Sequence, residues 1–284
     1  MRPKIWLTGS GGFIGSYLMR VASRMAPESE VVGLQRSEFD LLNFTALDRA
    51  FARDEPAAII HCAALSRTAD CQANPGLARQ VNFELTRHLA ELAANSSLIF
   101  FSSDLVFDGL KGDYVETDAV NPRSVYGETK AEAEAFVLRN PSHTVVRTSL
   151  NAGVSASGSR TFNEEITNAW MAGRATQLFH DEFRSPLGAS VTARAVWELA
   201  ANGQTGLFHL AGAERLSRVE IGELLARHWR KGVPKIESRS VRDYSGPPRC
   251  PDTSLNCAKL QAYLSQPLPR FSQWLEENLA EVAY

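Results

Sequence analysis

The chain has 284 residues, of which 44% are hydrophobic and 22% charged, and its formal net charge is −2. This length and apolar content suit one large α/β domain, or such a domain with a smaller appendage. The chain has no run of like charge, which speaks against a nucleic-acid partner, and no apolar run approaches the roughly 18 residues of a membrane span. We therefore expect a small ligand, with any phosphate-binding groups gathered locally.

The N-terminal stretch enters a predicted strand directly, without the longer apolar segment and cleavage site of a signal peptide. The four cysteines have no CxxC or zinc-site spacing and suit free thiols: Cys62, Cys71, Cys250 and Cys257. We expect a cytoplasmic protein without a metal site.

The first half of the chain alternates predicted strands and helices. Short β-branched or apolar runs predict strands over residues 4–8, 30–34, 57–62, 97–102 and 143–148. Between them, helical spacing and capping residues predict helices over residues 12–25, after Asn43, from Asn74-Pro75 to about Ala94, and over 124–139. This alternation predicts a parallel sheet that helices cover on both faces.

The alternation weakens in the second half. Helices are expected over 161–173, 190–202 and 217–230, the last with a capping box of Ser217 and Glu220. A Ser- and Gly-rich stretch, 154–160, is expected to be a flexible loop, and 244–250 a surface loop. We expect an NAD(P)-binding Rossmann domain over residues 1–150. Residues 151–284 would mostly form a small substrate-binding lobe, interleaved with the first because part of 175–210 returns to the sheet.

A glycine-rich loop follows the first strand and reads Gly9-Ser10-Gly11-Gly12-Phe13-Ile14-Gly15. Glycines there allow a tight turn, a close approach of a diphosphate to the backbone, and close helix packing. The N-terminus of the following helix offers unpaired N–H groups and partial positive charge to phosphates. Since the loop leaves an apolar strand and opens an amphipathic helix, it predicts a dinucleotide site in a Rossmann-type, doubly wound α/β fold.

The end of the second strand bears on the choice of dinucleotide. An acidic residue there accepts hydrogen bonds from the ribose of NAD, but this chain reads Gln35-Arg36-Ser37. Arg36 can pair with a 2′-phosphate and Ser37 can donate to it, so NADP is expected, with NAD as the alternative. Asp40 and Leu41 are expected to border the adenine.

Three residues further along suggest hydride chemistry. Ser103 closes the fourth strand at the sheet edge where ligands bind, and Tyr126 and Lys130 are four residues apart on a predicted helix. A nearby ammonium and a nicotinamide charge would lower the pKa of the phenol, so that Tyr126 gives a proton to a carbonyl while Ser103 orients it. Each residue taken alone also has an ordinary structural explanation; their order after the glycine loop favours the catalytic one.

With these motifs the chain resembles the extended short-chain dehydrogenases/reductases, and among them the dTDP-4-dehydrorhamnose reductase group. The resemblance rests on Thr8–Gly15, Ile60–Ala64, Ser102–Gly109, Tyr126–Lys130 and Arg147–Ser149. It implies an NADP-dependent reductase of a 4-keto nucleotide sugar with Ser103, Tyr126 and Lys130 as its catalytic trio. It also adds residues to the expected cofactor site, namely Cys62, Ala63, Ala64 and Asn82.

The resemblance points to a substrate side as well, with Ser103, Asp104, Val106, Asn163 and Arg184 as its candidate residues. Arg184 would clamp phosphates, or else form a surface ion pair, and Asn163 would contact sugar or phosphate, or else cap a helix. His61 and His209 lie in apolar strands and are expected to be core histidines.

The chain departs from the group at Leu105, where the motif usually has Tyr, and at Leu150–Gly153, where an aromatic pair is usual. These positions remove stacking surface around the sugar. We therefore expect a nucleotide-activated keto-sugar as the substrate class, without assigning the sugar.

Two alternatives remain open. An epimerase or dehydratase would return the hydride to its substrate from a tightly held cofactor. A non-catalytic NADP-binding regulatory subunit is the other, since the β subunit of methionine adenosyltransferase resembles this same group. For the partners we expect a small-molecule nucleotide sugar, no nucleic acid and no membrane, with a homodimer as an open option.

Overall fold

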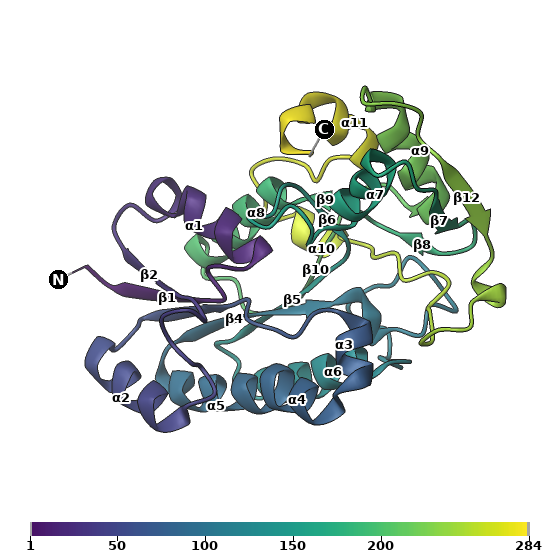
Figure 1. Cartoon of the computed structure of the whole chain (residues 1–284). Helices are drawn as coiled ribbons and strands as arrows, with labels where there is room; N and C mark the ends of the chain where they lie inside the picture. Colours follow the sequence, from purple (N-terminus) through teal and green to yellow (C-terminus); the bar gives the residue numbers. More distant parts are fainter. Residues whose placement is uncertain (1, 283–284) are drawn as a thin grey trace.

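The computed structural model describes residues 2–282 and has two parts, a helix-covered sheet and a smaller lobe beside it (Figure 1). The sheet has six strands in the order β10-β5-β4-β3-β1-β2, and every neighbouring pair is parallel. Its strands are β1 (Lys4–Thr8), β2 (Glu30–Leu34), β3 (Ala58–His61), β4 (Ser97–Ser103), β5 (Thr144–Thr148) and β10 (Gly206–Leu210). The predicted Rossmann-type sheet is confirmed. Because β2 and β3 flank β1 on opposite sides, the strand order reverses at β1, which places a ligand crevice at its carboxyl end.

Helices cover both faces of this sheet (Figure 1). On one face lie α1 (Phe13–Met25) and α8 (Ala189–Ala201), and on the other α2 (Phe44–Asp54), α5 (Leu85–Leu92) and α6 (Val125–Val137). Successive strand residues point to opposite faces: Leu7 and Ile60 pack with α1 and α8, whereas Trp6 and Ile59 pack with the opposite set. Burial on both faces explains why these strands read as continuous apolar runs.

The predicted helix from Asn74 to Ala94 proves to be several helical segments. Asn74 caps α4 (Pro75–Arg79), and a π-helical segment, Gln80–Glu84, joins it to α5. The structure also has a short helix that we did not predict, α3 (Thr68–Ala73). A single inserted residue makes a π-bulge without changing the apolar pattern visibly, so periodicity alone does not reveal it.

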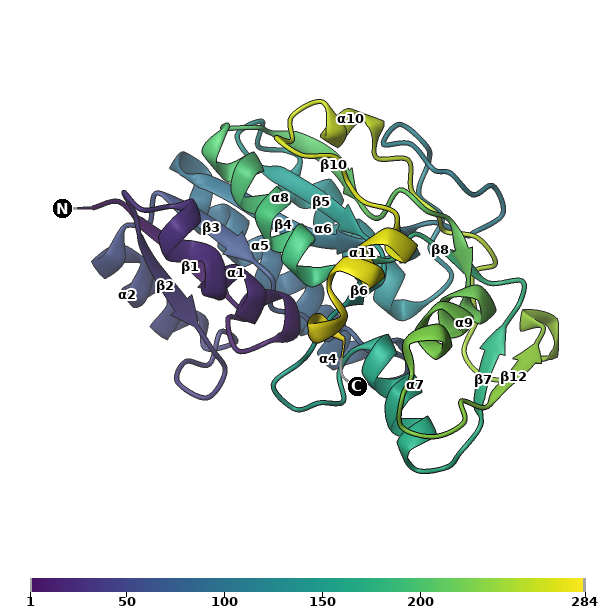
Figure 2. The same cartoon turned by 90° about the horizontal axis from the view of Figure 1, so that it is seen from above.

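The second lobe lies beside the carboxyl edge of the sheet (Figure 2). Its elements are β6 (Asn151–Ala152), α7 (Phe162–Met171), β7 (Thr176–Phe179), β8 (Phe183–Arg184), β9 (Leu187–Gly188), β11 (Leu216–Ser217), α9 (Arg218–His228), β12 (Ile236–Arg239) and α11 (Phe271–Glu277). The short helix α10 (Ala258–Gln261) packs instead beside β10, with Leu260 in the core of the sheet. Three two-stranded pairs, β6–β9, β7–β12 and β8–β11, support a separate core that includes Trp170, Trp229 and Phe271. The capping box of Ser217 and Glu220 is confirmed at the start of α9.

The chain crosses between the two parts more than once. After leaving the sheet at β5 it builds α7 to β9, then returns through α8 and β10, which pairs with β5 in parallel. The expected surface loop over 244–250 is largely exposed. Within residues 2–282, no helix is both long and apolar enough to cross a bilayer.

The stretch 154–160 is a loop, as expected, but hydrogen bonds to Glu164 and Arg67 hold it in place, so the expected flexibility is not supported. Glu164 accepts hydrogen bonds from the backbone of Ser155, Arg160 and Thr161 and from the Ser155 hydroxyl. Arg67, which follows β3, donates to the carbonyl of Ser159 at 3.2 Å. The loop therefore bridges the sheet and the second lobe in a defined conformation, which the Ser- and Gly-rich composition did not indicate.

Candidate active site

The glycine loop forms a tight turn between β1 and α1. Gly9 has φ of 69°, and a Cβ there would lie 2.7 Å from the backbone nitrogen of Ala63. A Cβ on Gly15 would lie 2.2 Å from the carbonyl oxygen of Gly9. Larger residues are therefore excluded at both positions, because the loop packs against its own backbone and against the residues that follow β3.

The N-terminus of α1 is open to an anion. Its N-cap residue is Gly12, which has no side chain to accept from the first N–H groups, and the first turn holds no acidic residue. These N–H groups follow the carboxyl end of β1, where the strand order reverses. Phe13, Ile14 and Gly15 thus offer the donors that a dinucleotide's diphosphate requires, and the residues present fit such a group.

At the end of β2, Gln35 lies against the glycine loop, with its Oε1 3.0 Å from where a Cβ on Gly11 would sit. Its amide donates to the carboxylate of Glu38. Arg36 and Ser37 are exposed, as the 2′-phosphate hypothesis requires. Glu38 was not among the predicted site residues, although it lies between Ser37 and Asp40 and places a carboxylate at the end of β2.

The other predicted adenine-side residues lie close by. Asp40 turns its carboxylate to the backbone N–H of Leu42, and Leu41 is buried among the apolar residues under α2. Ser10 packs against β2, since a Cβ on Gly33 would come within 2.9 Å of its side chain.

The segment after β3 is held by a buried asparagine. Asn82, in the π-helical segment, accepts from the backbone N–H of Leu65 at 2.8 Å and donates to its carbonyl at 3.1 Å. The same amide donates to Thr129 on α6 at 3.2 Å. Asn82 is fully buried and all its amide atoms are engaged. Its side chain therefore holds Leu65, the residue that follows Cys62, Ala63 and Ala64, and shapes the crevice through this backbone without facing it.

Ser103 and Tyr126 meet where β4 ends. A Cβ on Gly127 would lie 2.2 Å from the carbonyl oxygen of Leu105, so only glycine lets α6 pack this closely on the turn after β4. Ser124 caps α6 and accepts from the N–H of Gly127. As a result the side chains of Tyr126 and Ser103 are hydrogen-bonded to each other. Lys130, one turn later, is buried with its ammonium 4.1 Å from the centre of the Phe100 ring.

Burial shifts the pKa values of the titratable groups at this centre. Burial raises the pKa of Tyr126 above its usual value; the Ser103 hydrogen bond opposes the rise and the Asp104 charge adds to it. Burial also lowers the pKa of Lys130 to about 7, against the opposing charge of Glu134. The expectation of a lowered pKa for Tyr126 is therefore wrong for the protein by itself, in which that pKa is raised.

The predicted substrate residues are more deeply buried than the sequence indicated. Val106 is fully buried against Phe107 and offers no side-chain surface to a ligand. Asn163 is fully buried and bonds both the N–H and the carbonyl of Gly153, while Thr161 is the cap of α7. Asn163 is therefore not the cap of α7, and its amide binds the backbone of Gly153 in place of a ligand.

Arg184 is not on the surface. Its guanidinium lies 3.0 Å from Glu182 and 3.7 Å from Asp104, and it donates to the carbonyls of Phe183 and Cys250. The alternative of a surface ion pair is therefore wrong.

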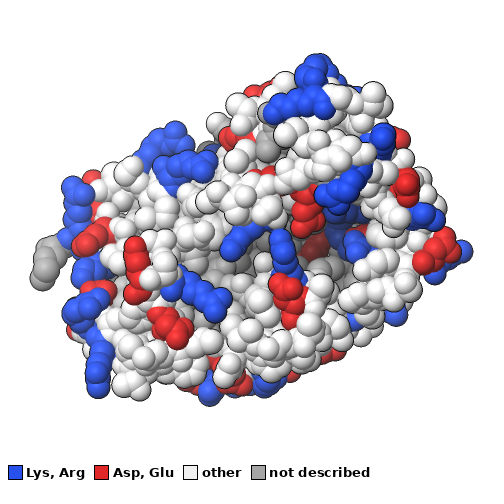
Figure 3. Space-filling view, viewed as in Figure 1, with Lys and Arg blue, Asp and Glu red and all other residues white. Residues whose placement is uncertain are grey.

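Two arginines that we did not single out surround the same glutamate. Arg249 pairs with Glu182 at 2.6 Å, and its side chain is 31% exposed. Arg218, partly exposed at the start of α9, also interacts electrostatically with Glu182. Its guanidinium lies 5.6 Å from the centre of the Phe162 ring. Arg218 is far from these residues in the chain and matches no motif, so only the tertiary structure brings it here. Figure 3 shows the surface hollowed between the sheet and this lobe, with residues of both signs on its wall.

The two histidines are core residues, as expected. His61 is hydrogen-bonded to Thr8 and Thr86, and His209 to the carbonyl of Tyr114 and to Arg147. Both are buried.

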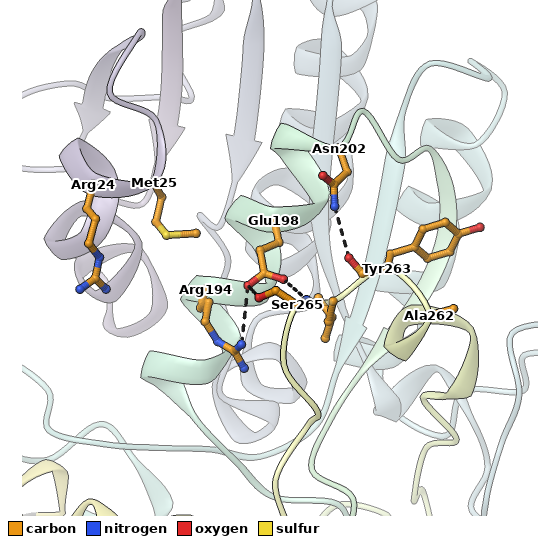
Figure 4. A pocket seen from close by; sticks show the side chains of 9 residues that line it. Arg24, Met25, Arg194, Glu198, Asn202, Ala262, Tyr263 and Ser265 are labelled. Atoms are coloured by element: carbon orange, nitrogen blue, oxygen red, sulfur yellow. Dashed lines mark hydrogen bonds and ion pairs between the residues drawn. The ribbon is translucent and has the colours of Figure 1, made fainter.

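A pocket of ≈ 620 Å³ lies elsewhere, between the last turns of α1 and α8 and residues 262–265 (Figure 4). Its polar side chains bind one another: Glu198 pairs with Arg194 and accepts two hydrogen bonds from Ser265. It lies at the opposite end of α1 from the glycine loop, roughly 16 Å away along the helix. Its contacts fasten the 262–265 segment to α8.

Comparison with known proteins agrees with this geometry. The family model described as the RmlD substrate binding domain matches residues 3–284. The dTDP-4-dehydrorhamnose reductase of Aggregatibacter actinomycetemcomitans is 28% identical over 91% of this chain and 92% of its own, and methionine adenosyltransferase 2 subunit beta of Bos taurus is 26% identical over 91% and 81%.

Solved structures show the same fold. A dTDP-4-dehydrorhamnose reductase from Clostridium acetobutylicum is 25% identical, covers 98% of both chains and superposes with a TM-score of 0.88. The Bacillus anthracis reductase in complex with NADP is 20% identical, covers 99% of this chain and all of its own, and gives 0.90. With a family model that spans nearly its whole length, this chain belongs to the RmlD substrate-binding domain family.

Proposed function

We propose that the protein is an NADP-dependent oxidoreductase that reduces a 4-keto nucleotide sugar, with NAD as an alternative cofactor. One observation carries the proposal: the hydrogen-bonded pair of Ser103 and Tyr126, with Lys130 buried one turn away, stands at the same sheet edge as the uncapped N-terminus of α1. The name of its bacterial relatives supports the substrate class.

The chemistry follows from these positions. A bound nicotinamide would supply a hydride to the carbonyl carbon. The phenol of Tyr126 gives its proton to the carbonyl oxygen, and the hydroxyl of Ser103 orients that oxygen. Since burial lowers the pKa of Lys130 to about 7, it could exchange protons near neutrality, and in this proposal it restores the proton that Tyr126 loses. The products are an alcohol and the oxidised cofactor.

The phosphates of the substrate need cationic partners in the second lobe. Arg184, Arg218 and Arg249 carry three positive charges against the carboxylates of Glu182 and Asp104. Arg218 and Arg249 are partly exposed, whereas Arg184 is buried. We assign Arg218 and Arg249 to contact phosphate, with Arg184 as the buried support of the same cluster.

In this proposal residues 1–150 bind the dinucleotide, and residues 151–284 mostly bind the sugar nucleotide, with α8 and β10 returning to the sheet. The working compartment would be the cytoplasm. The free state of all four cysteines supports this.

A second function has an observation in its favour, because relatives named methionine adenosyltransferase 2 subunit beta match the chain about as well as the reductases do. A non-catalytic NADP-binding partner protein would not need the trio of Ser103, Tyr126 and Lys130. The complete trio favours the enzyme.

One assay separates these functions. The purified protein would be mixed with NADPH or NADH and a panel of 4-keto nucleotide sugars, and cofactor absorbance and product would be followed. Cofactor consumption equal to product supports the reductase, and a changed sugar without net consumption supports an epimerase or dehydratase. Tight NADPH binding without turnover of any sugar supports the regulatory protein. Tyr126→Phe should lower kcat about 10²-fold or more with NADPH affinity retained.

A further inference from the structure

We propose that Asp104 is a positioning residue of this reaction, which sets the direction of the Ser103 hydroxyl and ties it to the second lobe. The inference rests on the proposed reductase function and deepens it. Sequence resemblance suggested instead that Asp104 contacts the substrate.

The carboxylate of Asp104 is already satisfied by protein groups. One oxygen, Oδ1, accepts from the hydroxyl of Ser103 at 3.1 Å. The other, Oδ2, accepts from Ser149 and Thr253, each at 2.9 Å, and lies 3.7 Å from Nε of Arg184. Only 5% of the residue is exposed. A buried carboxylate with these partners is held firmly in one place, and it has little surface left for a ligand.

The geometry at Ser103 fixes the proton of its hydroxyl. The oxygen accepts from the backbone N–H of Leu105 at 3.2 Å, so its lone pairs are partly used. A serine has one proton to donate, and here it points to Asp104. Ser103 must turn this same proton toward a substrate carbonyl, or toward the Tyr126 oxygen with which it is hydrogen-bonded. Asp104 therefore decides when that proton is available.

The opposite side of Asp104 leads into the second lobe. Arg184 on β8 joins Asp104 to Glu182, which lies 3.0 Å from its guanidinium, and Glu182 pairs with the partly exposed Arg249. Thr253 adds a second link from the segment that follows Arg249. A continuous polar chain thus runs from the proposed phosphate-binding arginines to the hydroxyl of Ser103. Seating of the lobe on a substrate and orientation of Ser103 are coupled through it.

Thr253 provides a sharp test, because its side chain is fully buried and its hydroxyl has Asp104 as a partner. Thr253→Val keeps the shape and removes the donor; Thr253→Ser keeps the donor. We expect the valine variant to lose about 10-fold in kcat, with KM for the sugar and the Kd of NADPH within about 3-fold of wild type. The serine variant should keep the wild-type kcat. Equal kcat values for the two variants, at matched thermal stability, would overturn the proposal.

Asp104→Asn tests the residue itself, with Asp108→Asn as the control. Asp108 is in the same stretch, but its carboxylate holds Leu110, Tyr114 and Asn121, away from Ser103. We expect about a 10²-fold loss of kcat for Asp104→Asn, NADPH binding retained, and kcat near wild type for Asp108→Asn.

A readout without turnover keeps this inference separate from the proposed function. The ionisation of Tyr126 would be followed by tyrosinate absorbance in the NADP⁺ complex, as the difference from Tyr126→Phe. The charged and titratable groups that act on its phenol are Asp104 and Cys71, together with the Ser103 hydroxyl. Asp104→Asn removes a negative charge and frees Ser103 to donate to the phenolate, so Tyr126 should ionise at lower pH. An unchanged midpoint for the ionisation of Tyr126 contradicts the link between Asp104 and Ser103, even if the wild type reduces no sugar. A lowered midpoint in a protein that reduces no sugar supports that link and rules out the proposed reductase function.

Discussion

The ammonium of Lys130 lies 4.1 Å from the centre of the Phe100 ring, and only 2% of the lysine is exposed. The ring face gives the cation an electrostatic partner in place of water. Since β4 supplies Phe100 and α6 supplies Lys130, this contact joins the strand that ends at Ser103 to the helix that carries Tyr126. The partnership does not offset the cost of burial, because the pKa of Lys130 is still lowered to about 7.

The buried charge should cost the protein stability in a defined pH window. Below pH 7 the folded state must keep a buried ammonium, and above it the folded state releases the proton while the unfolded lysine holds it up to its ordinary pKa of 10.5. The contribution of Lys130 to stability therefore improves between pH 7 and 10.5. Lys130→Met should raise the melting temperature on the order of 5 °C at pH 6 and less at pH 10. Calorimetry of this variant beside Lys231→Met, an exposed control, checks it; an equal gain at both pH values would refute it.

His209 should make the protein sensitive to acid. Burial, helped by the charge of Arg147, lowers the pKa of His209 to about 4, from an unfolded value near 6.5. The unfolded state alone takes up the proton between these values, so stability falls as the pH falls from 6.5 to 4, by up to about 1.4 kcal/mol per pH unit. Urea denaturation at pH 7 and pH 5 should show a smaller pH dependence for His209→Asn than for wild type. His180→Asn, at an exposed position, should retain the wild-type dependence.

Glu164 should control the order of the 154–160 loop. Burial acts to raise its pKa, but hydrogen bonds from Ser155, Thr161 and Arg160 together hold it below the ordinary value. Glu164→Gln replaces one acceptor oxygen by a donor facing N–H groups, at a cost of about 2 kcal/mol. Limited proteolysis should then cut the loop faster than in wild type. The neighbouring Glu165 is exposed and serves as the control, and equal cleavage of Glu164→Gln and Glu165→Gln would rule out this role.

The choice of dinucleotide should depend on Arg36 and Glu38. Arg36→Asp removes the proposed partner of the 2′-phosphate and should weaken NADPH binding about 10- to 100-fold, with little effect on NADH. Glu38→Gln removes a carboxylate from the same end of β2 and should shift preference further toward NADPH. Fluorescence titration with both cofactors measures each ratio. Parallel losses for NADPH and NADH in Arg36→Asp would exclude the contact.

Much of the fold follows from local patterns. The strands of the sheet and the helices that flank it have apolar periodicities and caps that residues a few positions apart determine, as at Asn43 and Ser217. The glycine loop is equally local, since Gly9 and Gly15 serve a turn of a few residues. The π-helical segment around Asn82 was missed, because one extra residue in a turn leaves the apolar pattern almost unchanged.

The sequence by itself determined the sheet class, because residues a few positions apart set the strand and helix patterns, and it predicted the dinucleotide loop and the trio of Ser103, Tyr126 and Lys130. Only the tertiary structure decided that Arg184 is buried, that Arg218 and Arg249 gather around Glu182, and that Asp104 holds Ser103 to Thr253. These contacts join residues far apart in the chain, and their energies depend on burial. Burial removes the water that would otherwise satisfy each charge, and it is a property of the packed protein, not of any one segment.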